Sequence, residues 1–367
     1  MQQLSIHRRR QIGLGLAGLI VVAGLLWGYY DAFTVSALVL AVALIWSSRE
    51  WKAWVIAATI LASGLLWSSF DNRGCSVRWK GELVYEKLSG RFAYVSWVDV
   101  WRRLVSPCVT LIGPDPTVAG RVKLIDKKTV DGHPWERYET DLGRFWLEAP
   151  GKETATWLIW EMTVQKDYDD GEASVRSGDT VIDCGAHVGF FTKYALGRGA
   201  ARVVAVEPDP TNLAGLEANL SEEIAAGRVS VVKAGVWKER TRLTLSHLDE
   251  DSARDTFFPG LPDAKEIEGI QVLPLDEIVE ELKLDRVDFI KMDIEGSERE
   301  ALQGARNTMA RFKPNMAICT YHIDDDTVVI PRVVKSANSL YQVQAKDIEA
   351  MQTSKGIEFR TKVLFFR

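Results

Sequence analysis

The chain has 367 residues, of which 26% are charged and 47% are hydrophobic, and its formal net charge is −5. This balance excludes a disordered tail and a purely membrane-embedded protein. The acidic net charge also argues against a protein that binds nucleic acid through bulk positive charge. The four cysteines lie far apart without a C-x-x-C pair, so the sequence predicts neither a zinc ribbon nor a disulfide scaffold.

Three uncharged runs occupy residues 11–30, 32–48 and 53–70, with aromatic residues near their ends. At about 1.5 Å per residue, a helix of roughly twenty residues crosses a hydrocarbon core of about 30 Å. We therefore expect residues 1–71 to be a membrane anchor of two or three hydrophobic helices, with the lipid bilayer as a partner. A cleaved signal peptide and a buried helical hairpin are the alternatives.

The orientation of this anchor does not follow cleanly from charge. Arg8, Arg9 and Arg10 favour a cytoplasmic N-terminus, and three full crossings would then place the rest of the chain outside. The large domain, however, is expected to need a cytosolic cofactor. We give the cofactor more weight and expect a multi-pass membrane protein whose catalytic domain faces the cytoplasm. Either one run does not cross, or the N-terminus lies outside.

Residues 72–135 give weak signals and are interpreted as a connector. Residues 136–148 read ERYETDLGRFWLE, in which two aromatic, alternating runs flank Asp141-Leu142-Gly143. This pattern is typical of a β-hairpin. Residues 136–367 are accordingly predicted to form one α/β domain that begins with the hairpin.

A strand, a glycine-containing turn and a helix are predicted from residue 180. The segment 180–183 is a short apolar strand that ends in an acid, Asp183. Gly185 allows a tight turn, and Gly189 allows close approach of a helix and a strand. The spacing is G-x-x-x-G rather than the G-x-G-x-x-G of dinucleotide enzymes.

A second strand, 202–206, ends in Glu207, which lies 24 positions after Asp183. This is near the spacing expected of a carboxylate that binds a ribose, although an ordinary exposed acid would also fit. Because the carboxyl ends of parallel strands meet at one edge of a sheet, we expect Asp183, Glu207 and Asp293 to emerge together. Further strands are predicted at 229–233, 271–273, 287–292, 316–320 and 362–367, and their alternation with helices indicates a largely parallel sheet.

The stretches DCGAHVGFFT, VEPDPTNLAGLEANL and DFIKMDIEGSEREALQGA resemble the FkbM-type methyltransferases, and YETDLGRFWLE resembles the segment that commonly precedes their core. The resemblance covers about residues 135–335. It implies a class I Rossmann-like methyltransferase domain that uses S-adenosyl-L-methionine. Two positions depart from the family pattern: His187 stands where asparagine is usual, and Cys319 stands where an acid is often seen.

The resemblance and the strand-end pattern together assign the cofactor site. The predicted cofactor-binding residues are Asp183, Gly185, Ala186, Gly189, Glu207 and Asp293. The backbone of 234–236 is expected to contact the adenine.

Transfer to a hydroxyl also needs a general base. Asp293 and His322 are the candidates, with Glu295 as an orienting group or an alternate base. A His322 satisfied by the backbone, and Glu295 and Glu298 as caps of the next helix, are the alternatives. No metal is assigned, although Asp293, Glu295 and His322 could converge on a divalent ion.

We therefore expect a membrane-anchored O-methyltransferase that acts on a hydroxyl of a glycan, a glycolipid or another membrane-associated metabolite, with no nucleic-acid partner. One alternative is a catalytically silent membrane scaffold whose Rossmann-like domain binds the cofactor. Another is an NAD-dependent enzyme, which the glycine spacing disfavours. The sequence leaves the acceptor and the oligomeric state open.

Overall fold

The computed structural model describes residues 77–100, 113–114, 116–130, 132–248, 252–259, 262–346, 349–353 and 356–367. The chain divides into two compact units, Met1–Tyr85 with Trp101–Thr110, and Glu86–Val100 with Leu111–Arg367. Helix α4 spans Val77–Ser89. The three uncharged runs of the predicted membrane anchor lie outside the described residues. Among the helices that are described, none is both long and apolar enough to cross a bilayer.

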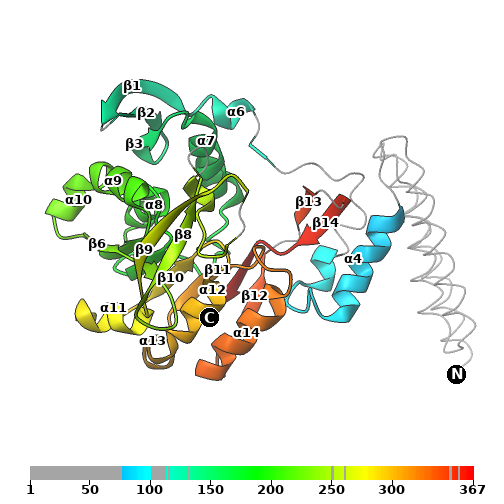
Figure 1. The fold of residues 1–367 in the computed structure, drawn as a ribbon. Coiled ribbons are helices and arrows are strands. Elements are labelled where there is room, and N and C mark those ends of the chain that lie inside the picture. The colour runs from blue at the N-terminus through cyan, green and yellow to red at the C-terminus, as the bar shows by residue number, and fades with distance from the viewer. Residues whose placement is uncertain are drawn as a thin grey trace, which may run out of the picture. The chain divides into compact units, whose positions relative to one another are not determined.

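The second unit is built on a central seven-stranded sheet (Figure 1). In spatial order its strands are β12 (Val343–Ala345), β15 (Val363–Phe366), β11 (Asn315–Cys319), β10 (Phe289–Met292), β4 (Thr180–Cys184), β5 (Arg202–Glu207) and β6 (Val229–Lys233). The five strands from β11 to β6 run parallel, whereas β15 is antiparallel to β11 and to β12. The chain therefore winds outward from β4 in both directions, which is the doubly wound arrangement.

Six of the predicted strands lie in this sheet, close to their predicted bounds. The predicted strand 271–273 does not. It is the end of β9 (Lys265–Leu273), which belongs to a separate sheet with β7 (Gly235–Val236) and β8 (Thr241–His247). Placing it in the central sheet was wrong, because a short apolar run does not show which sheet it joins.

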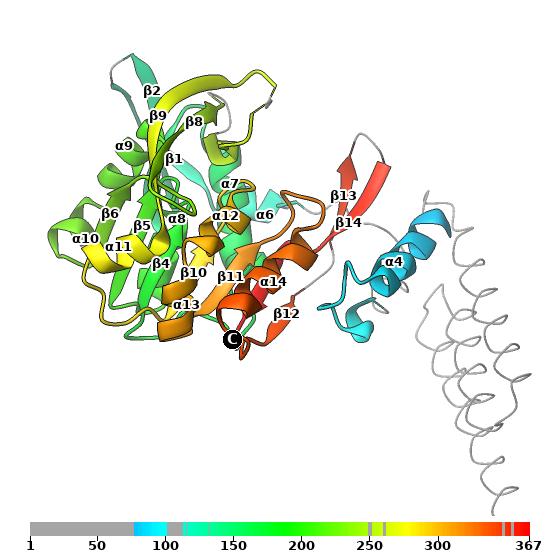
Figure 2. The same ribbon diagram turned by 60° about the horizontal axis from the view of Figure 1, so that its bottom comes forward.

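Helices cover both faces of the central sheet (Figures 1 and 2). One face carries α8 (Phe190–Gly197) and α9 (Pro210–Asn219), and α10 (Ser221–Ala225) follows α9 in the chain. The other face carries α11 (Leu275–Glu281), α12 (Glu298–Gln303), α13 (Arg306–Phe312) and α14 (Asp326–Ala337). Under α8 and α9, Phe191 and Leu216 share a buried cluster with the sheet residues Val181, Val203 and Phe289. Each such side chain stabilises the fold by about 1.5–3 kcal/mol when it is buried, so this layer fixes the helices against the strand ends.

The predicted hairpin is confirmed as β2 (His133–Thr140) and β3 (Gly143–Glu148). A further strand, β1 (Lys123–Val130), pairs antiparallel with β2. This small sheet therefore begins inside the segment that we interpreted as a connector. The neighbouring helices are α6 (Pro116–Ala119), α7 (Lys152–Trp160) and the π-helix η1 (Glu161–Gln165), and the remaining elements are the 3₁₀ turn η2 (Ser252–Arg254) and the hairpin β13 (Glu349–Thr353) and β14 (Gly356–Arg360).

Two contacts hold the small sheet to the nucleotide-fold core. The rings of Phe145 and Phe190 stack with their centroids 3.9 Å apart. The side-chain oxygen of Asn219 accepts the backbone N–H of Trp146 at 2.7 Å, and its amide donates to the carbonyl oxygens of Trp146 and Val188 at 3.0 and 2.9 Å. Asn219 therefore joins β3, α9 and the turn before α8, which is a structural role.

The turn after β4 shows why Gly185 and Gly189 must be glycines. Gly185 has a φ of +75°, and a Cβ atom there would lie 2.0 Å from the carbonyl oxygen of Asp293. Gly189 has a φ of +97°, and its Cβ would meet Leu216 and Leu220 at 3.0 Å. The close approach at Gly189 is thus to helix α9 rather than to a strand. Both positions combine a left-handed backbone with close packing, so glycine is required.

Replacing Gly185 with alanine should lower the free energy of unfolding by about 2–4 kcal/mol, because the backbone becomes strained and the new methyl group meets Asp293. Gly197 is the matched control, since it ends α8 and a Cβ atom there meets nothing within 4 Å. Gly197→Ala should leave stability unchanged or raise it by up to about 1 kcal/mol. Urea unfolding followed by tryptophan fluorescence measures both, and equal losses would contradict the explanation.

Candidate functional site

An open cleft lies at the carboxyl ends of β4, β5 and β10. Its empty space, counted together with the open solvent at its mouth, is about 520 Å³. Gly185, Glu207 and Asp293 line it at the three strand ends, and residues 234–236 line it as well. The structure thus brings part of the predicted cofactor site together at one edge of the sheet.

The other three predicted cofactor residues do not line the cleft. Asp183 is fully buried, and Ala186 is 3% exposed with its N–H donated to the carbonyl oxygen of Val206. Gly189 faces helix α9, as described above. These positions shape the turn that borders the cleft, and they do so from inside the protein.

Asp183 is paired with a lysine that the sequence analysis missed. Lys291 stands opposite Asp183 in the register of β10 and β4, and its Nζ lies 3.4 Å from Oδ1 of Asp183. Thr192 of α8 donates to the other carboxylate oxygen at 2.7 Å. Burial alone would lower the pKa of Lys291, but the carboxylates of Asp183 and Asp293 outweigh it and raise that pKa. A lysine inside the apolar strand FIKM was the signal, because a buried charge needs a counter-charge.

Lys291 also holds the glycine turn. Its ammonium donates to the carbonyl oxygens of Gly185 and Cys184 at 2.6 and 3.2 Å. The turn after β4 and the end of β10 are therefore tied to one buried cation. This tie fixes the distance between Gly185 and Asp293 at the base of the cleft.

Glu207 lies at the end of β5, where a ribose-binding acid was predicted. Its two carboxylate oxygens accept the backbone N–H groups of His187 at 2.8 Å and of Asp209 at 3.0 Å. Burial nevertheless raises the pKa of Glu207 to about 7. Because each carboxylate oxygen has two lone pairs, Glu207 can still accept hydrogen bonds from a ligand in the cleft.

His187, noted above as a departure from the pattern of the resembled family, has a φ of +49°. Histidine and asparagine both tolerate this left-handed conformation better than most residues. The contact with Glu207 uses the backbone N–H of His187, so it does not depend on the side chain. Burial lowers the pKa of His187 to about 4, and the imidazole is neutral at physiological pH.

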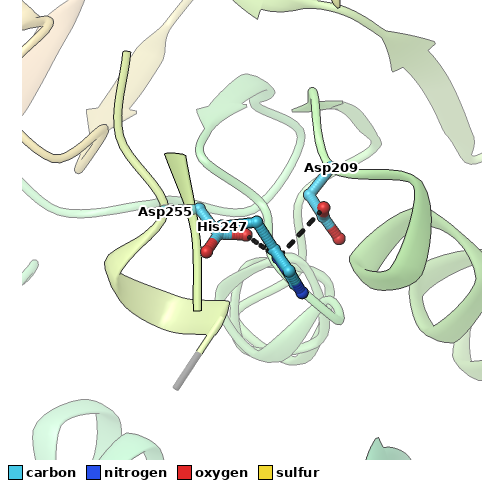
Figure 3. A group of neighbouring side chains, drawn as sticks. All are labelled: Asp209, His247 and Asp255. Carbon is cyan, nitrogen blue, oxygen red and sulfur yellow. Dashed lines mark hydrogen bonds and ion pairs between the residues drawn. The ribbon is translucent and has the colours of Figure 1, made fainter. Parts of the chain in front are cut away.

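A buried group of three side chains supports the wall of the cleft (Figure 3). Nδ1 of His247 lies 2.8 Å from Oδ2 of Asp255 and 3.3 Å from Oδ2 of Asp209. Hydrogen bonds to both carboxylates raise the pKa of His247 to about 10. Asp209 also caps α9 by accepting the N–H of Asn212 at 2.7 Å. The group therefore fastens the segment that contains Asp255, a cleft residue, to the start of α9.

Asp293 is oriented by a tyrosine that is remote in sequence. The hydroxyl of Tyr168 donates to Oδ2 of Asp293 at 2.6 Å. Burial would raise the pKa of Asp293, but the charges of Lys291 and His322 and the Tyr168 hydroxyl outweigh it, and the pKa is lowered. Asp293 is therefore an ionised group with little basicity. No local sequence pattern connects it to Tyr168.

His322 lies among three carboxylates. Its Nε2 is 3.2 Å from Oε1 of Glu295 and 3.6 Å from Oδ1 of Asp293, and its Nδ1 is 2.9 Å from Oε1 of Glu298. Burial would lower the pKa of His322, but the carboxylates of Glu298 and Glu295 raise it well above its usual value. A charged imidazole cannot take another proton, so these surroundings do not favour His322 as the resting base.

Glu295 and Glu298 differ in where they face. Glu295 lines the cleft, has a φ of +51°, and its pKa is raised by burial. Glu298 is fully buried and accepts the backbone N–H of Ile294 at 3.0 Å. Ile294 precedes α12, so this hydrogen bond is not a helix cap, and Ser297, the N-cap residue of α12, makes no side-chain cap hydrogen bond either.

Comparison with known proteins finds similarity to one family of methyltransferases. Residues 183–352 match the model of the methyltransferase FkbM domain. The 31-O-demethyl-FK506 methyltransferase FkbM of Streptomyces tacrolimicus is 28% identical over 180 residues, which cover 42% of this chain and 69% of that protein. Methyltransferase sdnD of Sordaria araneosa is 24% identical over 202 residues, which cover 47% of this chain and 77% of that protein.

A solved structure of the same family is also similar. The crystal structure of methyltransferase FkbM from Methylobacillus flagellatus KT has 23% sequence identity and a TM-score of 0.38. The match covers 68% of this chain and 57% of that one, so the chain spans a little over half the length of that solved protein.

Replacing Lys291 with methionine should lower the free energy of unfolding by about 3–5 kcal/mol, because the carboxylate of Asp183 would remain buried without a counter-charge. Adding Asp183→Asn should recover at least about 1 kcal/mol of this loss, since the unpaired charge is then gone. Urea unfolding of the single and double variants measures the difference. A double variant no more stable than Lys291→Met would show that the ion pair is not the source of the loss.

Proposed function

The chain carries a domain of the FkbM methyltransferase family over residues 183–352, and from this premise we propose that it is an S-adenosyl-L-methionine-dependent O-methyltransferase. The observation that carries the proposal is the cleft at the strand ends, which has Glu207 at one side and Asp293 with Glu295 at another. The name of the Streptomyces relative specifies a 31-O-demethyl substrate, which motivates oxygen as the acceptor atom here.

The residues of the cleft fit this cofactor. An acid at the end of the second strand can accept hydrogen bonds from both ribose hydroxyls, and Glu207 occupies that place. The ring of Phe257 lies so close to Gly235 that a Cβ atom on the glycine would be 2.5 Å from it. Both residues line the cleft, and together they make a flat, apolar wall suited to an adenine. The Gly185 turn, next to Asp293, borders the space for the methionine part.

When bound, S-adenosyl-L-methionine supplies an electrophilic methyl group on a sulfonium sulfur. In the transfer, the acceptor oxygen forms a bond to the methyl carbon while the sulfur–carbon bond breaks, and the sulfur keeps the electron pair as a thioether. The protein contributes position above all, since holding two reactants in line can lower a barrier by about 7–11 kcal/mol. The Lys291 tie between the glycine turn and β10 keeps the two sides of the cleft in register.

The proton of the acceptor hydroxyl must leave as the new bond forms. Asp293 and Glu295 are the carboxylates that line this side of the cleft. Of the two, Glu295 is the stronger base, because burial raises its pKa while the pKa of Asp293 is lowered. His322 holds a positive charge next to both and stabilises their ionised forms. We propose that the proton passes to a carboxylate of this group.

The anchor and the acceptor remain proposals that rest on the sequence. The three uncharged runs before residue 71 support tethering to a bilayer, with the methyltransferase domain on the cytoplasmic side, where the cofactor is made. A tethered enzyme meets hydroxyl groups close to the lipid surface. A glycan, a glycolipid or another membrane-associated metabolite is therefore the proposed acceptor class.

The full chain should transfer a labelled methyl group from S-adenosyl-L-methionine to a component of a lipid or polysaccharide extract. Mass spectrometry should show a product heavier by one CH₂ unit, and base-stable linkage of the label would identify an ether. Binding of the cofactor without transfer to any extract would instead support a silent scaffold. Binding of NAD in place of S-adenosyl-L-methionine would contradict the proposal.

Cofactor affinity should rise about tenfold between pH 6 and pH 8. The pKa of Glu207 is about 7 in the free protein, and ribose hydroxyls that donate to its carboxylate favour the ionised form. Binding of the cofactor therefore lowers the pKa of Glu207. Below pH 7 the cofactor must compete with the proton on this carboxylate, so its affinity falls. Calorimetric titration with S-adenosyl-L-methionine at several pH values measures the rise. Glu207→Gln, which has the same size and does not titrate, should bind more weakly with a flat profile; an unchanged slope would contradict the assignment.

A further inference from the structure

The side chains of Asp293, Glu295 and His322 meet beside the cleft. One oxygen of each carboxylate and one nitrogen of the imidazole all lie within 4.8 Å of one another. Nε2 of His322 is 3.2 Å from Glu295 and 3.6 Å from Asp293. Atoms that bind one divalent ion at about 2.0–2.2 Å lie roughly 3.0–3.5 Å apart. The spacing is therefore close to that of a coordination sphere.

Two of these atoms are buried and make no hydrogen bond, although Nε2 of His322 lies in an ion pair with Glu295. Within the described part of the chain, neither Nε2 of His322 nor Oδ1 of Asp293 has a hydrogen-bond partner. The His322 side chain is only 7% exposed, and an unsatisfied buried polar atom costs about 1–3 kcal/mol. The two atoms point toward the same place, 3.6 Å from each other. A ligand shared between them would account for the arrangement.

The other nitrogen of His322 is held by a carboxylate. Nδ1 faces Oε1 of Glu298 at 2.9 Å, and Glu298 is fully buried. Histidines that bind a metal through one nitrogen usually donate the other N–H to such a group, which fixes the ring. The same oxygen of Glu298 accepts the N–H of Ile294 at 3.0 Å. One buried carboxylate thus positions the ring and the turn that carries Asp293 and Glu295.

The group in Figure 3 also consists of two carboxylates and one imidazole, but in a different arrangement. There, Nδ1 of His247 faces both carboxylates and lies at hydrogen-bond distance, 2.8 Å, from Asp255. The second oxygen of Asp255 accepts the N–H of Leu248 at 2.9 Å, and Asp209 caps helix α9. The nitrogen between the carboxylates is thus already used, and the group serves to fasten two segments.

We propose that Asp293, Glu295 and His322 bind one divalent cation, with Glu298 as the positioning residue of His322. Two carboxylates and one imidazole form a mixed oxygen and nitrogen donor set, which suits a first-row transition ion such as Mn²⁺ better than Ca²⁺. Two ligand carboxylates also balance the charge of a divalent ion, which would take the place of the proton on Nε2 of His322. Its use in catalysis rests on the proposed function: a cation beside the acceptor would lower the pKa of the acceptor hydroxyl, so a weakly basic carboxylate would suffice.

Binding of Mn²⁺ to the chelator-treated full chain tests the site without cofactor or acceptor. The free ion is counted by its electron paramagnetic resonance signal, and pulsed measurements detect coupling of the bound ion to ¹⁴N of an imidazole. We expect one tightly held Mn²⁺ per chain with ¹⁴N coupling. His322→Ala should remove the coupling and weaken binding at least tenfold. Glu298→Gln should keep the coupling and weaken binding about 10- to 100-fold.

Asp255→Asn, in the group of Figure 3, is the matched control and should change neither the stoichiometry nor the coupling. Glu295→Gln is the second ligand variant if His322→Ala does not fold by circular dichroism, and it should also weaken binding at least tenfold. Absence of binding at millimolar Mn²⁺, or binding that survives in both ligand variants, would overturn the proposal. Because neither readout involves methyl transfer, failure here is distinguishable from failure of the proposed function.

Discussion

The buried ammonium of Lys291 is the constraint on which the rest of the site depends. It stands in a central strand opposite Asp183, and it donates to the carbonyl oxygen of Gly185. A charge in this position must be compensated from inside the protein, since the side chain is only 6% exposed. The compensation ties the turn after β4 to the end of β10. The geometry of the cleft thus depends on an ion pair whose two residues do not line it.

Two acidic regions with different electrostatics border the cleft. On one side, burial raises the pKa of Glu207 to about 7, so a ligand that donates hydrogen bonds to this carboxylate would lower that pKa. On the other side, Asp293 and Glu295 share the charge of His322, which three carboxylates surround. The first region suits recognition of neutral hydroxyl groups. The second region suits the binding of a positively charged group, such as a proton, a sulfonium or a metal cation.

The sequence was sufficient where a local pattern corresponds to one structure. Short apolar strands that end in acids predicted β4, β5 and β10, and glycines at left-handed positions predicted the turn. It was not sufficient for contacts between distant segments. The hydrogen bond from Tyr168 to Asp293, for example, joins residues that are 125 positions apart. Strand ends also do not tell which way a side chain turns, and so Asp183 was expected in the cleft although it faces Lys291.

The central claim is that acids at neighbouring strand ends hold S-adenosyl-L-methionine in this cleft, with its sulfur toward Asp293 and Glu295. A crystal structure of the chain with S-adenosylhomocysteine tests it most directly. The account predicts both ribose hydroxyls within hydrogen-bond distance of the Glu207 carboxylate and the thioether sulfur beside the Gly185 turn. A nucleoside bound elsewhere, with Glu207 keeping only its hydrogen bonds from His187, Asp209 and Asn212, would contradict it.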